Sequence, residues 1–166
     1  MNRPIDLDRE MRAAIELRDT EQFEQSCTQF QNLVRRFPDH AELNFQAAWS
    51  HDRAGLQKVA CGYYEQALKL PDLSKEDRQE AMLGLGSTYR VLGRHEESVA
   101  ILEQAVREFS ETAALRAFLA ISYFSAGFQE KALGVLLNVL ADTSSDPSVG
   151  EYLRPIRQYA DEFLAG

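Results

Sequence analysis

The sequence is poor in the residues typical of secreted, membrane-spanning and nucleic-acid-binding proteins. It contains only two cysteines, Cys27 and Cys61, without a C-x-x-C pair, which excludes a disulfide-rich secreted scaffold. No run reaches the roughly 18 apolar residues of a membrane span, and the amino-terminal MNRPIDLDRE carries charges where a signal peptide needs an apolar core. Lys and Arg number 18 against 26 Asp and Glu, and the net charge of −8 would repel a phosphate backbone. We therefore predict a cytoplasmic protein that binds neither nucleic acid nor a membrane, with both cysteines as buried free thiols.

Motifs for catalysis or metal binding are also missing. His40, His51 and His95 lie in three separate segments, without an i, i+4 pair of histidines. The stretch Gly84–Ser87 is neither a phosphate-binding loop nor a nucleophile elbow, because no strand precedes it, and its glycines instead indicate close packing of helices. The sequence predicts no catalytic residue, no metal site and no cofactor.

A regular repeat period organises the chain. Residues 79–112, QEAMLGLGSTYRVLGRHEESVAILEQAVREFSET, contain two helical patterns that meet at a glycine. Five positions of this stretch recur one period later. Leu85, Tyr89, Gly93, Ser98 and Leu102 correspond to Leu119, Tyr123, Gly127, Ala132 and Leu136.

This period and residue order resemble the tetratricopeptide repeat, a helix–turn–helix unit that stacks into a solenoid. The resemblance covers nearly the whole chain, which is similar to short, stand-alone bacterial tetratricopeptide proteins. It implies an all-α fold: a right-handed superhelical solenoid of about four units plus a C-terminal capping helix, in a single domain over residues 1–166. The expected units are about 7–40, 41–74, 79–112 and 113–146, with a terminal helix over 147–165.

Local signals indicate where individual helices begin. In the first unit, which lacks the glycine between its helices, Thr20 is expected to cap the second helix. Ser74 is expected to start a longer first helix in the third unit, within a short insertion that exceeds the period. Asp146 followed by Pro147 predicts the start of the last helix, and Pro155 predicts that this helix is kinked or divided.

In tetratricopeptide proteins the first helix of each unit lines a concave surface to which partners bind. The resemblance therefore implies a groove with aromatic, aliphatic and arginine side chains. Its candidate residues are Phe45, Trp49, Arg53, Leu83, Arg90, Phe118, Ile121 and Phe124. Family members that grip a terminal carboxylate use Lys, Asn and Arg at such places, so the apolar residues here argue against a carboxylate clamp.

The apolar groove residues form too large a surface to leave in water. Three explanations compete: the terminal helix folds back over them, a second copy of the protein covers them in a homodimer, or an amphipathic or extended peptide binds there. The predicted function is a non-catalytic protein–protein interaction scaffold that binds a protein partner or a second copy through this groove. The alternatives are a structural subunit of a larger complex and a ligand carrier, and no sequence pattern indicates an enzyme.

Overall fold

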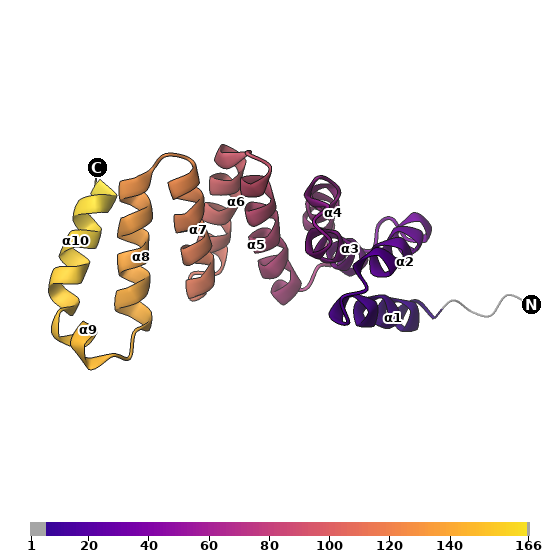
Figure 1. Ribbon diagram of the computed structural model, residues 1–166, viewed down its shortest axis with the longest axis horizontal. Helices are drawn as coiled ribbons and strands as arrows, with labels where there is room; N and C mark the ends of the chain where they lie inside the picture. The colour runs from indigo at the N-terminus through magenta and orange to yellow at the C-terminus, as the bar shows by residue number, and fades with distance from the viewer. Residues whose placement is uncertain (1–5, 166) are drawn as a thin grey trace, which may run out of the picture. The chain divides into compact units, whose positions relative to one another are not determined.

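The computed structural model describes residues 6–165, and every regular element in this range is an α-helix (Figure 1). Eight helices form four helix–turn–helix repeats, which we number 1 to 4. They are α1 (Leu7–Asp19) with α2 (Phe23–Arg36), α3 (Ala41–Arg53) with α4 (Gln57–Lys69), α5 (Lys75–Val91) with α6 (His95–Glu108), and α7 (Ala113–Ser125) with α8 (Gln129–Thr143). The terminal segment forms α9 (Pro147–Glu151) and α10 (Leu153–Ala165). The predicted all-α, helix–turn–helix architecture is confirmed.

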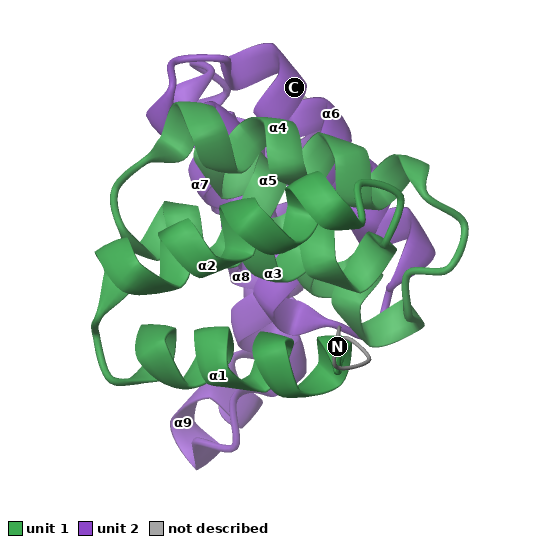
Figure 2. Ribbon diagram, turned by 90° about the vertical axis from the view of Figure 1, so that its right-hand side faces the viewer, with its two compact units in different colours: residues 1–88 green, residues 89–166 purple. Residues whose placement is uncertain are grey.

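The chain divides into two compact units, residues 1–88 and residues 89–166 (Figure 2). In unit 1, α2 packs against α1 and α3, and α3 packs against α4. In unit 2, α7 packs against α6 and α8, and α8 packs against α10. The boundary between the units lies within α5, and the single domain expected from the sequence stays a prediction.

One backbone conformation recurs in the turn of every repeat. Gly55, Gly93 and Gly127 have φ angles of 75°, 76° and 89°, and Glu21 has a φ of 62° at the corresponding place in repeat 1. Glycine takes this left-handed region without the steric cost that a Cβ atom imposes. Repeat 1 therefore keeps the turn geometry of the other three repeats although it lacks their glycine.

The start of α2 differs from the sequence-based expectation. Thr20 lies at the C-terminal end of α1, where its hydroxyl donates a hydrogen bond to the carbonyl of Glu16 at 2.8 Å. The second helix begins only at Phe23, after the left-handed Glu21. The prediction that Thr20 caps the second helix is wrong, because the turn leaves this residue attached to the first helix.

Two other helix starts are as predicted. The Ser74 hydroxyl accepts a hydrogen bond from the amide of Asp77 at 3.0 Å, and α5 begins directly after Ser74. The Asp146 carboxylate caps α9, whose first residue is Pro147. The terminal segment divides between α9 and α10, and Pro155 lies in the first turn of α10, where a missing N–H costs no helical hydrogen bond.

Candidate functional site

The candidate residue with the best-defined surroundings is Trp49 on α3, in unit 1. The guanidinium carbon of Arg18, on α1, lies 4.1 Å from the centroid of the Trp49 ring. Phe45 lies one turn earlier on α3, and its ring centroid is 5.9 Å from that of Trp49. Trp49 nevertheless remains 40% exposed. The ring is therefore fixed by its neighbours and still accessible to a partner.

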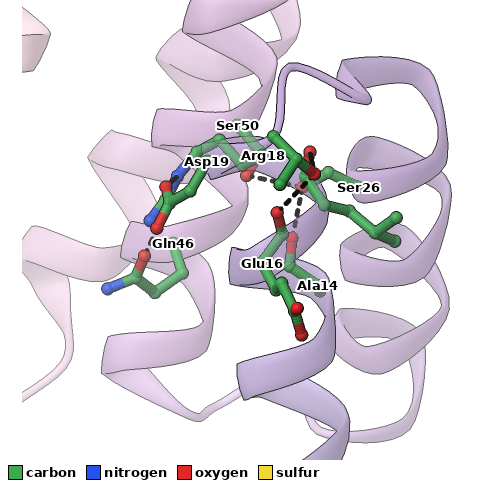
Figure 3. A network of polar contacts seen from close by, with 9 residues as sticks. Ala14, Glu16, Arg18, Asp19, Ser26, Gln46 and Ser50 are labelled. Carbon is green, nitrogen blue, oxygen red and sulfur yellow. Dashed lines mark hydrogen bonds and ion pairs between the residues drawn. The ribbon is translucent and has the colours of Figure 1, made fainter.

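Arg18 is held in place by two polar contacts (Figure 3). Its Nη1 atom donates to Oε1 of Gln46 at 2.7 Å, and its Nε atom donates to a carboxylate oxygen of Asp19 at 3.3 Å. The side chain is only 4% exposed, and this burial lowers the pKa of Arg18 because it disfavours the charged form. Arginine nevertheless stays protonated in proteins, so a buried positive charge lies against the Trp49 ring.

Phe45 does not contribute an exposed surface. Its side chain is 3% exposed, and its ring centroid is 6.4 Å from that of Tyr64 on α4. Tyr64 in turn reaches α5, where a Cβ atom placed on Gly84 would lie 2.6 Å from its hydroxyl oxygen. Burial raises the pKa of Tyr64 above the ordinary range of a phenol. Phe45 and Tyr64 therefore support Trp49 from inside the core, and Gly84 serves close helix packing as predicted.

Two other candidates, Arg53 on α3 and Leu83 on α5, also belong to unit 1. The Arg53 guanidinium lies 5.5 Å from the ring centroid of Phe23, on α2. Leu83 is half-buried on α5. Next to Arg53 on α3, burial raises the pKa of the Asp52 carboxyl, and a hydrogen bond with Thr88 opposes that rise. The structure thus brings Phe45 and Trp49 together and turns Arg53 toward Phe23.

The remaining candidates belong to unit 2. Arg90 at the end of α5 and Phe118 on α7 are half-buried. Ile121 and Phe124, three residues apart on α7, are 44% and 65% exposed. That the candidates of the two units line one groove stays a prediction.

Sequence reasoning missed Arg18, although the repeat contained the signal. Asp52, Arg90 and Phe124 occupy one position of the first helix in repeats 2 to 4, and Arg18 precedes Asp52 by one repeat period. Applying the period once more toward the amino terminus would have placed Arg18 beside the candidate residues.

The buried histidine is a core residue. His51 is fully buried on α3, with its Nδ1 atom 2.7 Å from the carbonyl oxygen of Ala47 and its Nε2 atom 3.0 Å from the amide nitrogen of Gln31. These partners fit a neutral ring that donates from Nδ1 and accepts at Nε2. Burial lowers the pKa of His51, which keeps the ring neutral.

Within residues 6–165, no three His, Cys, Asp or Glu side chains are grouped so that they could hold a metal ion. None of the helices in that range combines the length and the apolar composition needed to cross a membrane.

Solved structures with the same fold include three of particular interest. MamA from Desulfovibrio magneticus RS-1 is 13% identical, with a TM-score of 0.73 over 96% of this chain and 91% of that chain. YrrB, described as a tetratricopeptide protein with an unusual peptide-binding site, is 17% identical, with a TM-score of 0.67 over 94% and 81% of the two chains. The nearly identical repeats of a putative kinesin light chain from Podosopora anserina are 22% identical, with a TM-score of 0.70 over 99% and 94%. At these identities the likeness concerns the fold alone.

A sequence model of the tetratrico peptide repeat matches residues 41–163, which is most of the chain. The matched region includes repeats 2 to 4 and the terminal helices. Together with the recurring turn geometry, this match shows that the chain belongs to the tetratricopeptide repeat family.

Proposed function

We propose that this protein is a non-catalytic interaction scaffold that binds an extended segment of a partner protein, with Trp49 as the principal anchor. The observation that supports this function is the stack of Arg18 on Trp49, which fixes a ring that is still 40% exposed. A ring that is already fixed loses little conformational entropy on binding, and Trp and Arg are enriched among the residues that dominate binding energy.

The surroundings of Trp49 suit a segment that pairs an apolar side chain with an acidic one. The indole edge offers apolar contact area, and the exposed Arg53 on the same helix as Trp49 supplies positive charge, whereas the buried Arg18 already pairs with Asp19. Attraction between Arg53 and a carboxylate of the segment would set its orientation and speed its association. In unit 2, Phe118, Ile121 and Phe124 are proposed as a further apolar contact surface.

The family supports this function in general terms. Tetratricopeptide proteins are interaction modules, and one protein with the same fold, YrrB, is described as having a peptide-binding site. The proposal for this chain rests on Trp49 and its neighbours, because the likeness to YrrB concerns the fold alone.

A displayed random-peptide library selected against the wild-type protein provides the test. Trp49 is the only tryptophan, so its fluorescence reports whether a selected peptide reaches it, and the anisotropy of a labelled peptide gives the dissociation constant. We expect Trp49→Ala to raise this constant by about 30-fold, as for a strong anchor residue. Arg18→Lys keeps the charge and loses the planar stacking, so its effect should be intermediate.

Leu56→Ala serves as a matched control, because Leu56 is an exposed apolar residue of unit 1 (46%) that lies outside α3, at the N-cap of α4. It should bind the selected peptides as the wild type does. The combined variant Trp49→Ala, Phe118→Ala should lose binding while circular dichroism shows unchanged helicity. Unchanged binding in this double variant would contradict the proposed site.

A further inference from the structure

The last repeat leaves open a helix face that the first three repeats bury. Phe30, Tyr64 and Leu102 occupy one position of the second helix and are 0%, 2% and 0% exposed. Leu136 occupies the same position in repeat 4 and is 43% exposed. In repeats 1 to 3 the first helix of the following repeat covers this position, as when α3 packs against α2 and α7 against α6.

Two more leucines extend this open face along α8. Leu133 and Leu140 lie about one turn on either side of Leu136 and are 44% and 42% exposed. Their spacings of three and four residues place all three side chains on one side of the helix. We call Leu133, Leu136 and Leu140 the leucine stripe.

The terminal helix packs on another side of α8. A Cβ atom placed on Gly134 would lie 2.8 Å from Cγ of Leu164 and 2.9 Å from the carbonyl oxygen of Ala160, so α10 approaches α8 closely at this glycine. The corresponding residue of repeat 2, Gly62, is exposed, with nothing within 4 Å of such a Cβ atom. The capping helix therefore covers the outer side of α8, which the earlier repeat leaves in solvent.

The sequence of α10 explains why it does not take the place of a fifth first helix. Ala120 fills the small-residue slot of α7, and Tyr123 follows it three residues later. One period later these slots hold Arg154 and Arg157. A long charged side chain does not fit where two helix backbones approach closely, so the leucine stripe stays uncovered by α10.

The exposed aromatic side of α10 lies beside the stripe. On one edge of the α8–α10 contact, Arg157 donates to Asp142 at 2.8 Å. Leu140 lies two residues before Asp142 on α8, and Tyr159 lies two residues after Arg157 on α10. Two residues correspond to about 200° around a helix, so Leu140 and Tyr159 lie on the edge of the α8–α10 contact opposite to this ion pair. Tyr152, which directly precedes α10, comes seven residues or about two helical turns before Tyr159, and the two side chains are 62% and 56% exposed. Helices α8 and α10 run side by side (Figure 1), and we call the leucine stripe together with these two tyrosines the terminal face.

The terminal face approaches the size that a stable contact needs. A tyrosine can bury on the order of 150–250 Å², so the two half-exposed tyrosines offer roughly 200 Å². With the leucine stripe the face reaches several hundred Å², beyond the single apolar residues scattered over an ordinary surface. Two such faces in contact would bury on the order of 1,000 Å², the lower bound for a specific interface.

The distribution of charge favours a second copy of the same face as the occupant. The stripe side of α8 carries no charge, because the residues spaced by three and four along it are Gln129, Leu133, Leu136, Leu140 and Thr143. Two copies can therefore pair along this side without repulsion between like charges. In an antiparallel pair, Leu133 of one copy meets Leu140 of the other.

Head-to-tail packing on the first helix is disfavoured by the composition of that helix. The exposed side chains of α1 include Asp8, Arg9, Arg12 and Glu16. Seating these on the terminal face would bury charges against leucines without partners.

We propose that a second copy of this chain docks on the terminal face and forms a two-fold symmetric homodimer, with the leucine stripes at its centre. A two-fold contact uses the same surface on both partners and closes without leaving a face free for further growth. The proposal does not rest on the partner-binding function, because that function uses Trp49 on α3 and residues of α7, whereas the leucine stripe lies on α8.

The test is the molar mass in solution, measured by light scattering behind a sizing column over a dilution series. We expect the full chain to give twice its mass of 18.8 kDa. The variant Leu133→Glu, Leu136→Glu should give the single-chain mass, with the dissociation constant raised by at least about 100-fold. Because both leucines are more than 40% exposed, helicity should be retained. Leu56→Glu changes an equally exposed leucine of unit 1 and should leave the dimer intact.

A cross-link tests the contact directly. In a background with Cys27→Ala and Cys61→Ala, Leu136→Cys places a thiol near the expected two-fold axis and should form a disulfide between two chains under mild oxidation. Leu56→Cys in the same background should not. A wild-type protein that is monomeric at every concentration would overturn the proposal, and so would a dimer that persists in Leu133→Glu, Leu136→Glu.

Discussion

The hydroxyl oxygens of Ser98 and Ser122 lie 2.8 Å apart and are buried between α6 and α7. An equivalent pair of serines occurs in unit 1, where the hydroxyl oxygens of Ser26 and Ser50 lie 3.1 Å apart (Figure 3). Each pair joins the second helix of one repeat to the first helix of the next.

Removing one member of the Ser98–Ser122 pair should cost more than removing both. Ser98→Ala leaves the buried Ser122 hydroxyl without its partner and should lower the free energy of unfolding by about 1–2 kcal/mol. The double variant Ser98→Ala, Ser122→Ala should lie closer to the wild type, because no buried hydroxyl is left unsatisfied. Urea unfolding of the four proteins in this cycle measures the coupling. Additive losses would show that the hydrogen bond contributes nothing.

Replacing Glu21 by glycine should stabilise the protein. Glu21 has a φ of 62°, a conformation that costs a residue with a Cβ atom about 1 kcal/mol relative to glycine. We expect Glu21→Gly to raise the free energy of unfolding by about this amount in thermal or denaturant unfolding. Glu21→Ala removes the same charge and keeps the Cβ atom, so it separates the backbone effect from electrostatics. A larger gain from alanine would contradict the backbone explanation.

Two helical glycines should respond in opposite directions to alanine. A Cβ atom on Gly84 would lie 2.6 Å from the ring of the buried Tyr64, so Gly84→Ala should destabilise the protein by about 1–3 kcal/mol. On Gly62 the same atom meets nothing within 4 Å, and Gly62→Ala should stabilise α4 by about 0.5–1 kcal/mol through helix propensity. Chemical denaturation of both variants checks the pair. Equal shifts would mean that contact with Tyr64 is not the controlling factor.

Acidification should weaken the protein through His51. Burial lowers the pKa of His51 in the folded state, so below about pH 6.5 the unfolded chain binds a proton that the folded chain does not. The free energy of unfolding should therefore fall as the pH drops below about 6.5, by up to about 1.4 kcal/mol per pH unit, and level off below the folded-state pKa.

The comparison with His51→Gln isolates this contribution. Burial raises the pKa of Asp52, which has the opposite effect on the protein. As the pH rises and this buried carboxyl ionises, the free energy of unfolding falls. Subtracting the pH profile of His51→Gln from that of the wild type removes the Asp52 contribution. If the two profiles run parallel between pH 5 and 7, His51 does not titrate as the structure implies.

The sequence alone was sufficient to predict the structural features that recur from repeat to repeat. The repeat period locates the helix pairs, and the turn glycines mark the left-handed positions. Ser74 and Asp146 mark helix starts through capping that involves only neighbouring residues. These features are local, so the pattern of residues determines them.

The features that the sequence did not reveal depend on packing between helices. Phe45 and Trp49 look alike in sequence, and only their position relative to Tyr64 and Arg18 makes one buried and the other accessible. The side of α8 that α10 covers depends on the close contact at Gly134, which no periodicity encodes.

Both cysteines lie in unit 1, at equivalent places one repeat period apart, and both are buried free thiols as expected. Each is only 4% exposed, so a thiol-modifying reagent can reach it only when the surrounding helices open. Unit 2 contains no cysteine. The rate of thiol modification in the native protein therefore reports the opening of unit 1 alone, and comparison with the global unfolding rate would show whether the two units unfold together.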